Sequence, residues 1–303
     1  MLNRNIHFGI LLHINSTHRN ISGIMGSLNY ILIMKGDIRV KENIAFYDEY
    51  FSFPAFDDMN RARIFKDAYI REKVFTDYIY KFISFTEDEE LNKTKIQLIR
   101  DKKLWVSNYK NFVDKNEVSV RYNMLKVSRK AQVPSGSIRF LIDTGKQMND
   151  VSCFTYDITP FMWKYYANNS NGLCLIFKLI DTDKFFPVIY LDKSEIDFTD
   201  DLLHAFQTQD FKYISRLSIL PWVLKDKNFR QEDELRFLCG DIYDSEDGVM
   251  GGRIAPDKKE LLGYKGTTYA YEYAGIKLSD ILIGSNCKDD CKKEIITLLD
   301  KDK

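Results

Sequence analysis

Two glutamates one residue apart, followed by an arginine, form the most suggestive chemical motif in the sequence. Glu232, Glu234 and Arg236 lie in the stretch KDKNFRQEDELRF, residues 225–237. In a strand, these three side chains would share one face, while Leu235 and Phe237 would anchor the other face in a core. Paired carboxylates in a cleft can orient a hydroxyl group and accept a proton. A neighbouring guanidinium can keep a carboxylate ionised or bind a phosphate. The alternative is an ordinary solvated strand face, which is the commoner origin of short charge motifs.

A second group of polar residues follows a short apolar run near the start of the chain. In LLHINSTHRNISGI, residues 11–24, His13 stands at the end of a predicted strand, just before a polar turn. A histidine in that place can donate a hydrogen bond to a sugar hydroxyl, and Ser16 and Thr17 would add donors. The plainer interpretation is a histidine that makes one ordinary hydrogen bond.

Aromatic residues crowd the stretch CFTYDITPFMWKYYANNSNGLCLIF, residues 153–177. Core packing is the default explanation for such density. The alternative is an aromatic wall for a flat ring such as nicotinamide or adenine.

Composition excludes several classes of protein. The chain has 303 residues with 44 basic and 44 acidic side chains, so its balanced charge gives no general argument for nucleic acid or an anionic membrane as a partner. No apolar run approaches the roughly 18 residues that span a bilayer, and the N-terminus lacks the features of a signal peptide.

Five cysteines, of which only Cys287 and Cys291 are close in sequence, predict a reducing cytoplasm and no disulfide framework. Cys287 and Cys291 are better interpreted as two thiols one helical turn apart than as metal ligands, since the sequence offers no second pair of ligands.

The elements that would position these residues are of mixed type, which predicts an α+β fold. Residues 5–34 suggest a strand, a short helix and a second strand. Residues 40–133 look mainly helical, with amphipathic spacing in NRARIFKDAYIREKVFTDYIYKFISF and EELNKTKIQLIRDKKLWVSNYKNFVDK, and VPSGS at 133–137 marks a boundary. The region after this boundary contains five stretches that predict strands: VSCFTYD, GLCLIFKL, PVIYL, DELRFLCGDIY and GTTYAYEYAGIKLSDILIG. It also contains three predicted helices. The first is capped by Thr159 and has Pro160 at its first position, the second covers TDDLLHAFQTQDFKYISRLS, and the last is CKKEIITLLDK. We predict one domain over 1–303, in which 40–133 is a mainly helical insertion and the core comprises 1–39 and 134–303.

The C-terminal half resembles a bacterial domain of unknown function, the family numbered 2971. The resemblance covers residues 150–299 and rests on three pieces: VSCFTYDITPFMWKYYANNSNGLCLIF, the order Lys225, Phe229, Glu232, Glu234 and Arg236, and IKLSDILIGSNCKDDCKKEIITLL. The second piece matches a Lys…Trp…Glu-x-Glu-x-Arg pattern, with Phe229 where the family has tryptophan.

A more distant similarity concerns ADP-ribosyltransferases of the His-Tyr-Glu class. Their first strand and helix resemble LLHINSTHRNISGI, although Ile14 and Asn15 stand where those enzymes often have glycine. The similarity implies an ADP-ribosyltransferase-like mixed sheet and NAD as substrate. His13 would hold the adenosine ribose, Phe154 or Tyr156 would stack on nicotinamide, Glu234 would be the catalytic glutamate and Glu232 would orient the acceptor.

The resemblance implies a mono-ADP-ribosyltransferase or an NAD glycohydrolase, acting as a toxin or phage-defence effector on an unknown protein or nucleic-acid acceptor. Two alternatives stay open. The chain could be a non-catalytic regulatory protein of a defence system that binds a nucleotide or a partner. It could also be an effector directed at nucleic acid, in which the helical segment grips the strand.

Overall fold

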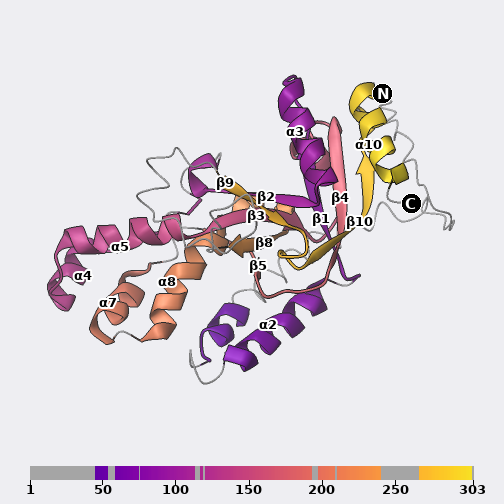
Figure 1. The fold of residues 1–303 in the computed structure, drawn as a ribbon. Helices are drawn as coiled ribbons and strands as arrows, with labels where there is room; N and C mark the ends of the chain where they lie inside the picture. Colours follow the sequence, from indigo (N-terminus) through magenta and orange to yellow (C-terminus); the bar gives the residue numbers. More distant parts are fainter. Residues whose placement is uncertain are drawn as a thin grey trace, which may run out of the picture.

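The fold has a mixed α+β architecture built on an antiparallel sheet (Figure 1). The structure, a computed structural model, describes residues 45–53, 59–74, 76–112, 117–118, 120–192, 197–208, 210–239 and 266–301. The elements predicted over 5–34, with His13, Ser16 and Thr17, lie outside these ranges. Within the described ranges, no helix combines the length and apolar character needed to cross a membrane.

Eight strands in the described part form the main sheet. They are β1 (Tyr78–Ser84), β2 (Lys103–Ser107), β3 (Asp150–Thr155), β4 (Gly172–Leu179), β5 (Phe185–Pro187), β8 (Glu234–Cys239), β9 (Gly266–Ala270) and β10 (Ile276–Ile283). Their order is β10-β4-β1-β3-β2-β9, and β8 pairs with both β3 and β5. A separate parallel pair joins β6 (Ile189–Leu191) to β7 (Leu224–Asp226).

The sheet splits beside β3. Strand β8 pairs with β3 along its whole length, so β8 occupies one edge of β3. Strands β1 and β2 therefore share the other edge, β1 through Tyr80↔Thr155 and β2 through Ser107↔Val151. Beyond these two contacts they leave β3, and the helix that connects them, α3 (Glu89–Arg100), lies over the opening between them.

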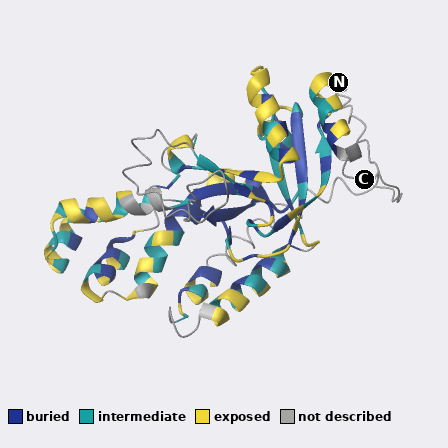
Figure 2. Ribbon diagram, viewed as in Figure 1, coloured by how far each residue is buried: buried dark blue, intermediate teal, exposed yellow. Residues whose placement is uncertain are grey.

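Helices pack around the sheet and stand at both of its ends (Figure 1). Besides α3, they are α2 (Met59–Lys73), α4 (Met124–Ala131), α5 (Ser135–Met148), α6 (Pro160–Tyr165), α7 (Thr199–Thr208), α8 (Phe211–Val223) and α10 (Asp289–Lys301), with 3-10 turns at Tyr109–Asn111 and Lys227–Glu232. Helices α4, α5, α7 and α8 group together at one end, and α3 and α10 stand at the other (Figure 1). Figure 2 shows dark blue strands at the centre of the sheet, where β3, β4 and β8 are largely buried, whereas β2, β9 and β10 keep exposed residues.

The two faces of the sheet carry different cores. One core contains Ile79, Phe154 and Leu235 from β1, β3 and β8. The other contains Val151 and Leu238 from the opposite faces of β3 and β8. Side chains alternate along a strand, so these two cores determine which face each neighbouring residue occupies.

Most elements predicted after residue 138 are confirmed. Strand β3 corresponds to VSCFTYD, and Thr159 accepts a hydrogen bond from the amide of Met162 at the start of α6, with Pro160 in the first turn as expected. The helix predicted over residues 199–218 is interrupted, because Asp210 caps a new helix, α8, by accepting from the amide of Lys212.

The interpretation of residues 60–85 as one amphipathic helix is wrong. Helix α2 ends at Lys73, Asp77 adopts a left-handed conformation with φ of 58°, and Tyr78–Ser84 forms β1. Strand β1 pairs along its whole length with β4, from Tyr78↔Lys178 to Ser84↔Gly172. Residues 103–107, also expected to be helical, form β2. The range 40–133 is thus rich in helices but also supplies two strands of the central sheet.

Candidate active site: a buried carboxylate pair beside a cleft

The two glutamates of the opening motif are buried. The exposed fraction is 1% for Glu232, 4% for Glu234 and 0% for Arg236. The alternative of a solvated strand face is therefore wrong for this motif. Leu235 and Phe237 point into the core on the other face of β8, as predicted.

A turn, and not strand alternation, brings the two carboxyl groups together. Glu232 is the last residue of a 3-10 helix, and Asp233 follows in the left-handed region with φ of 46° and ψ of 58°. Strand β8 begins only at Glu234. The prediction that Glu232 lies in the strand is wrong, because the left-handed residue redirects the chain. Aspartate tolerates this conformation better than most side chains.

Both carboxyl groups bind the same lysine. The Lys225 ammonium donates to Glu232 Oε2 and, at 2.8 Å, to Glu234 Oε1. Arg236 Nε donates to Glu234 Oε2 at 2.9 Å. The other guanidinium nitrogens of Arg236 donate to a Glu117 carboxylate oxygen and, at 2.6 Å, to the backbone carbonyl of Trp222. We call Glu117, Lys225, Glu232, Glu234 and Arg236 the charge cluster.

The charge cluster contains three carboxyl groups and two cations, so full ionisation would leave one excess negative charge in a buried site. Burial and the neighbouring Glu234 carboxylate raise the pKa of Glu232 to about 8. Burial acts in the same sense on Glu234, but Arg236 and Lys225 outweigh it and hold the pKa of Glu234 well below its ordinary value. The proton of the pair therefore resides on Glu232, and Glu234 is the ionised member.

Aromatic side chains surround the charge cluster. The Tyr190 hydroxyl accepts a hydrogen bond from the Glu234 amide at 2.8 Å. The Tyr166 hydroxyl shares a hydrogen bond with the Glu232 carboxyl, and its pKa is raised by burial and by that carboxyl. The Phe229 ring centre lies 5.2 Å from the Lys225 ammonium. These contacts hold Glu232 and Glu234 in fixed positions.

Phe154, Tyr156 and Arg236, the other described residues predicted to bind the ligand, are buried. The Phe154 ring packs edge-on against Phe177 and Phe185 in the core, on the face of β3 opposite to Glu234. Tyr156 is buried in the same core. The Arg236 guanidinium is enclosed by the charge cluster and does not reach solvent. The structure thus brings Glu232, Glu234 and Arg236 together, and it places Phe154 and Tyr156 in packed positions.

A cleft of about 480 Å³ lies in the split between β1 and β2, under α3. Its lining includes Lys81 and Phe82 from β1, Lys103 and Trp105 from β2, Lys95 from α3, and Tyr166. Tyr166 both lines the cleft and hydrogen-bonds Glu232, so this side chain connects the cleft with the charge cluster.

Sequence reasoning missed Lys81 and Glu117 as parts of this region, and it considered Tyr166 only as a member of the aromatic stretch 153–177, without its contact to Glu232. Lys81 is a lysine between Ile79 and Ile83, two residues away on either side, which on a strand places it on the core face. The helical interpretation of β1 concealed that signal. Glu117 lies far from the motif in sequence, and nothing in its neighbourhood indicates its contact with Arg236.

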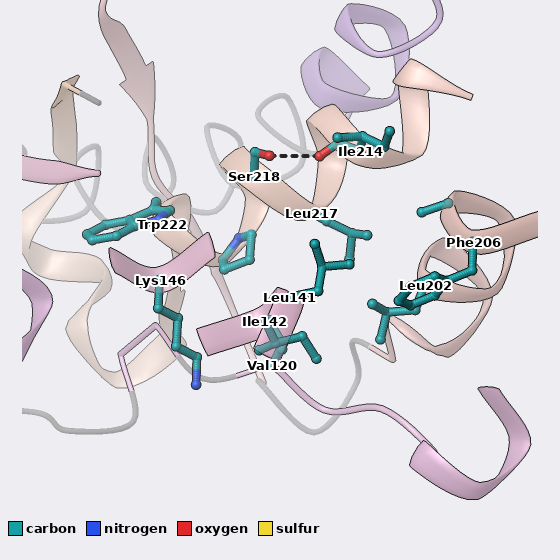
Figure 3. A pocket seen from close by; sticks show the side chains of 12 residues that line it. Val120, Leu141, Ile142, Lys146, Leu202, Phe206, Ile214, Leu217, Ser218 and Trp222 are labelled. Carbon is teal, nitrogen blue, oxygen red and sulfur yellow. Dashed lines mark hydrogen bonds between the residues drawn. The ribbon is translucent and has the colours of Figure 1, made fainter. Parts of the chain in front are cut away.

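A second pocket, of about 390 Å³, lies among α5, α7 and α8 (Figure 3). Its lining is almost wholly apolar, with Leu202, Leu217 and Trp222 on its walls and Lys146 at its margin (Figure 3). It lacks the convergent polar groups expected of a catalytic site. Among the residues that the structure describes, no group of three or more His, Cys, Asp or Glu side chains is arranged to hold a metal ion.

Comparison with known proteins returns no match: no protein-family model, no curated protein and no solved structure is detectably similar to the chain.

Proposed function

We propose that this protein acts on NAD as a mono-ADP-ribosyltransferase or an NAD glycohydrolase. The supporting observation is the pair Glu232 and Glu234, whose shared environment drives their pKa values apart. Such pairs commonly divide catalytic roles, because one carboxyl group stays ionised while the other exchanges a proton near neutral pH. The role of effector in a toxin or phage-defence system follows from the family resemblance.

The proposed reaction breaks the bond between nicotinamide and ribose. The electron pair of that bond leaves with nicotinamide, and positive charge develops on the ribose. The ionised Glu234 would stabilise this charge electrostatically. A water molecule or an acceptor group then adds to the sugar carbon, and the deprotonated form of Glu232 would accept its proton.

Release of nicotinamide from NAD tests this proposal. Glu234→Gln and Glu232→Gln should each lower the rate by about 10²- to 10⁴-fold, the usual contribution of a catalytic acid or base. Glu272→Gln is a matched control, because Glu272 is an exposed glutamate in the turn after β9. The absence of nicotinamide release and of label transfer to any acceptor would overturn the enzymatic proposal.

A second candidate function is binding of a nucleotide or a partner without turnover. Its support is the saturation of the charge cluster, since Lys225 and Arg236 already occupy the carboxylate oxygens of Glu234. In this case the cluster would fix the geometry of the fold. Retention of NAD by the purified protein, with no nicotinamide release, would favour this function.

A further inference from the structure

The split in the sheet leaves part of one edge of β3 without a strand partner, and Lys81 occupies that place. Its ammonium donates to the Ser152 hydroxyl at 2.7 Å and to the Cys153 carbonyl at 3.1 Å, between the points where β1 and β2 join β3. The same ammonium lies 5.2 Å from the Phe154 ring centre. Lys81 thus stands where the two strands diverge, in the wall of the cleft.

The positive charge of Lys81 has no ion-pair partner among the described carboxylates. Its two hydrogen bonds go to a neutral hydroxyl and a neutral carbonyl, whereas a lysine has three donors. Glu234, which influences it electrostatically, lies on the other face of the sheet and is already paired with Lys225 and Arg236. A partly buried ammonium without a counter-ion is costly, and an anion in the cleft would relieve that cost.

The rest of the lining is mainly apolar and adds two lysines, of which Lys95 also donates to the Ser84 carbonyl at 2.6 Å, a combination that suits an anionic molecule with a flat ring. Three of the described lining residues, Lys81, Lys95 and Lys103, are basic, and none is acidic. Trp105 leaves 42% of its surface exposed, which is unusual for a tryptophan, and it lies on the β2 side of the cleft. The volume of about 480 Å³ falls within the range of small-molecule sites.

We propose that the cleft between β1 and β2 binds a nucleoside phosphate, with the phosphate at Lys81 and the base against Trp105. Neither Glu232 nor Glu234 lines the cleft, so nucleotide binding at Lys81 can be measured without catalysis by the glutamate pair, although Tyr166 contacts both regions. The site could bind a nucleotide that is a substrate or one that regulates the protein. The inference thus goes beyond the proposed function and is tested separately from it.

Calorimetric titration with ADP, adenosine and inorganic pyrophosphate tests the site. ADP should bind more tightly than adenosine, which lacks the charge, and than pyrophosphate, which lacks the ring. Lys81→Met should weaken ADP binding by about 10- to 100-fold, the usual effect of losing a hydrogen bond to a charged group. Lys277→Met, which removes an exposed lysine from β10, should leave binding unchanged.

Trp105 provides a second test that leaves Lys81 in place. Trp105→Ala should weaken ADP binding, and Trp105→Phe should restore most of it because a ring is retained. Equal ADP affinity in Lys81→Met and wild type, or no ADP binding by the folded wild type at millimolar concentration, would overturn the proposal. Nicotinamide release is measured independently, so loss of turnover with retained ADP binding would count only against the enzymatic proposal.

Discussion

At the scale of single residues, Lys225 is the side chain of the charge cluster whose loss should lower the free energy of unfolding. Its ammonium contacts both Glu232 and Glu234, and all three side chains are buried. Lys225→Met would leave two neighbouring buried carboxyl groups without this cation. Removal of one partner from a buried ion pair commonly costs about 3–5 kcal/mol. We expect a loss of this size in the free energy of unfolding, measured by urea denaturation.

A matched control lies two residues further along the chain. Lys227 is exposed and contacts Asp192 at 3.4 Å. Lys227→Met should change the free energy of unfolding by no more than about 1 kcal/mol, as for other surface ion pairs. Similar losses in the two variants would contradict the stabilising role assigned to Lys225.

The raised pKa of Glu232 predicts an unusual dependence of stability on pH. The folded protein holds this proton up to a pKa of about 8, whereas an unfolded glutamate has a pKa of 4.5. Over that window the folded state binds more protons, so this residue stabilises the fold at low pH and the contribution is lost as pH rises through about 8. Glu234 behaves oppositely, and its contribution is lost only as pH falls below its unfolded pKa. Glu232→Gln should therefore flatten the decline of unfolding free energy between about pH 5 and about pH 8.5. An identical decline in wild type and variant would contradict the assignment of the proton.

At the scale of elements, strands could be predicted from the sequence where proline or glycine showed the position of the neighbouring turn. They could not be predicted where the strand follows a helix directly and its apolar residues keep a helix-like spacing. Pro160 and Gly172 delimit α6 and β4 clearly, and both elements form as expected. Strand β1 has no such marker, since residues 74–77, which separate it from α2, contain neither proline nor glycine, and Asp77 takes the left-handed conformation instead. Its identity depends on pairing with β4, nearly a hundred residues away, which local spacing does not encode.

The pairing of β1 with β4 depends on one glycine. A Cβ atom at Gly172 would lie 2.1 Å from the backbone carbonyl oxygen of Ile83. The backbone at this contact has little room to shift, so Gly172→Ala should lower the free energy of unfolding by about 1–3 kcal/mol or more.

Gly136 in α5 provides the control, because a Cβ atom there meets nothing within 4 Å. Gly136→Ala should leave stability unchanged or raise it by up to about 1 kcal/mol, because alanine favours a helix. Equal effects in thermal denaturation would contradict this difference.

At the scale of the whole molecule, the candidate site depends on long-range contacts that no short motif contains. Glu117 reaches Arg236 across more than a hundred residues, and Tyr166 reaches Glu232 from another element. The sequence motif identified the two glutamates and the arginine as neighbours. It did not predict their burial, since that depends on packing of β8 between β3 and β5. The cleft was also beyond sequence reasoning, because it arises from the divergence of β1 and β2.

In the described part of the molecule, a third and much smaller core at the helical end accompanies the two cores of the sheet. Val127, Ile138 and Leu202 are completely buried between α4, α5 and α7. This cluster is much smaller than the core that contains Ile79 and Phe177 on the sheet. A small core stabilises its region less, so the helical end should open at a lower free energy than the sheet.

Hydrogen exchange of backbone amides distinguishes these regions. Leu202→Ala and Ile79→Ala each remove a fully buried aliphatic side chain and should each cost about 2–5 kcal/mol locally. After Leu202→Ala, amides of α4 and α7 should exchange much faster, while those at the centre of β4 keep most of their protection. After Ile79→Ala, protection should fall in β4 as well, since β1 and β4 are paired and share one core. A uniform loss throughout the protein with Leu202→Ala would instead show that the helical end and the sheet unfold as a single unit.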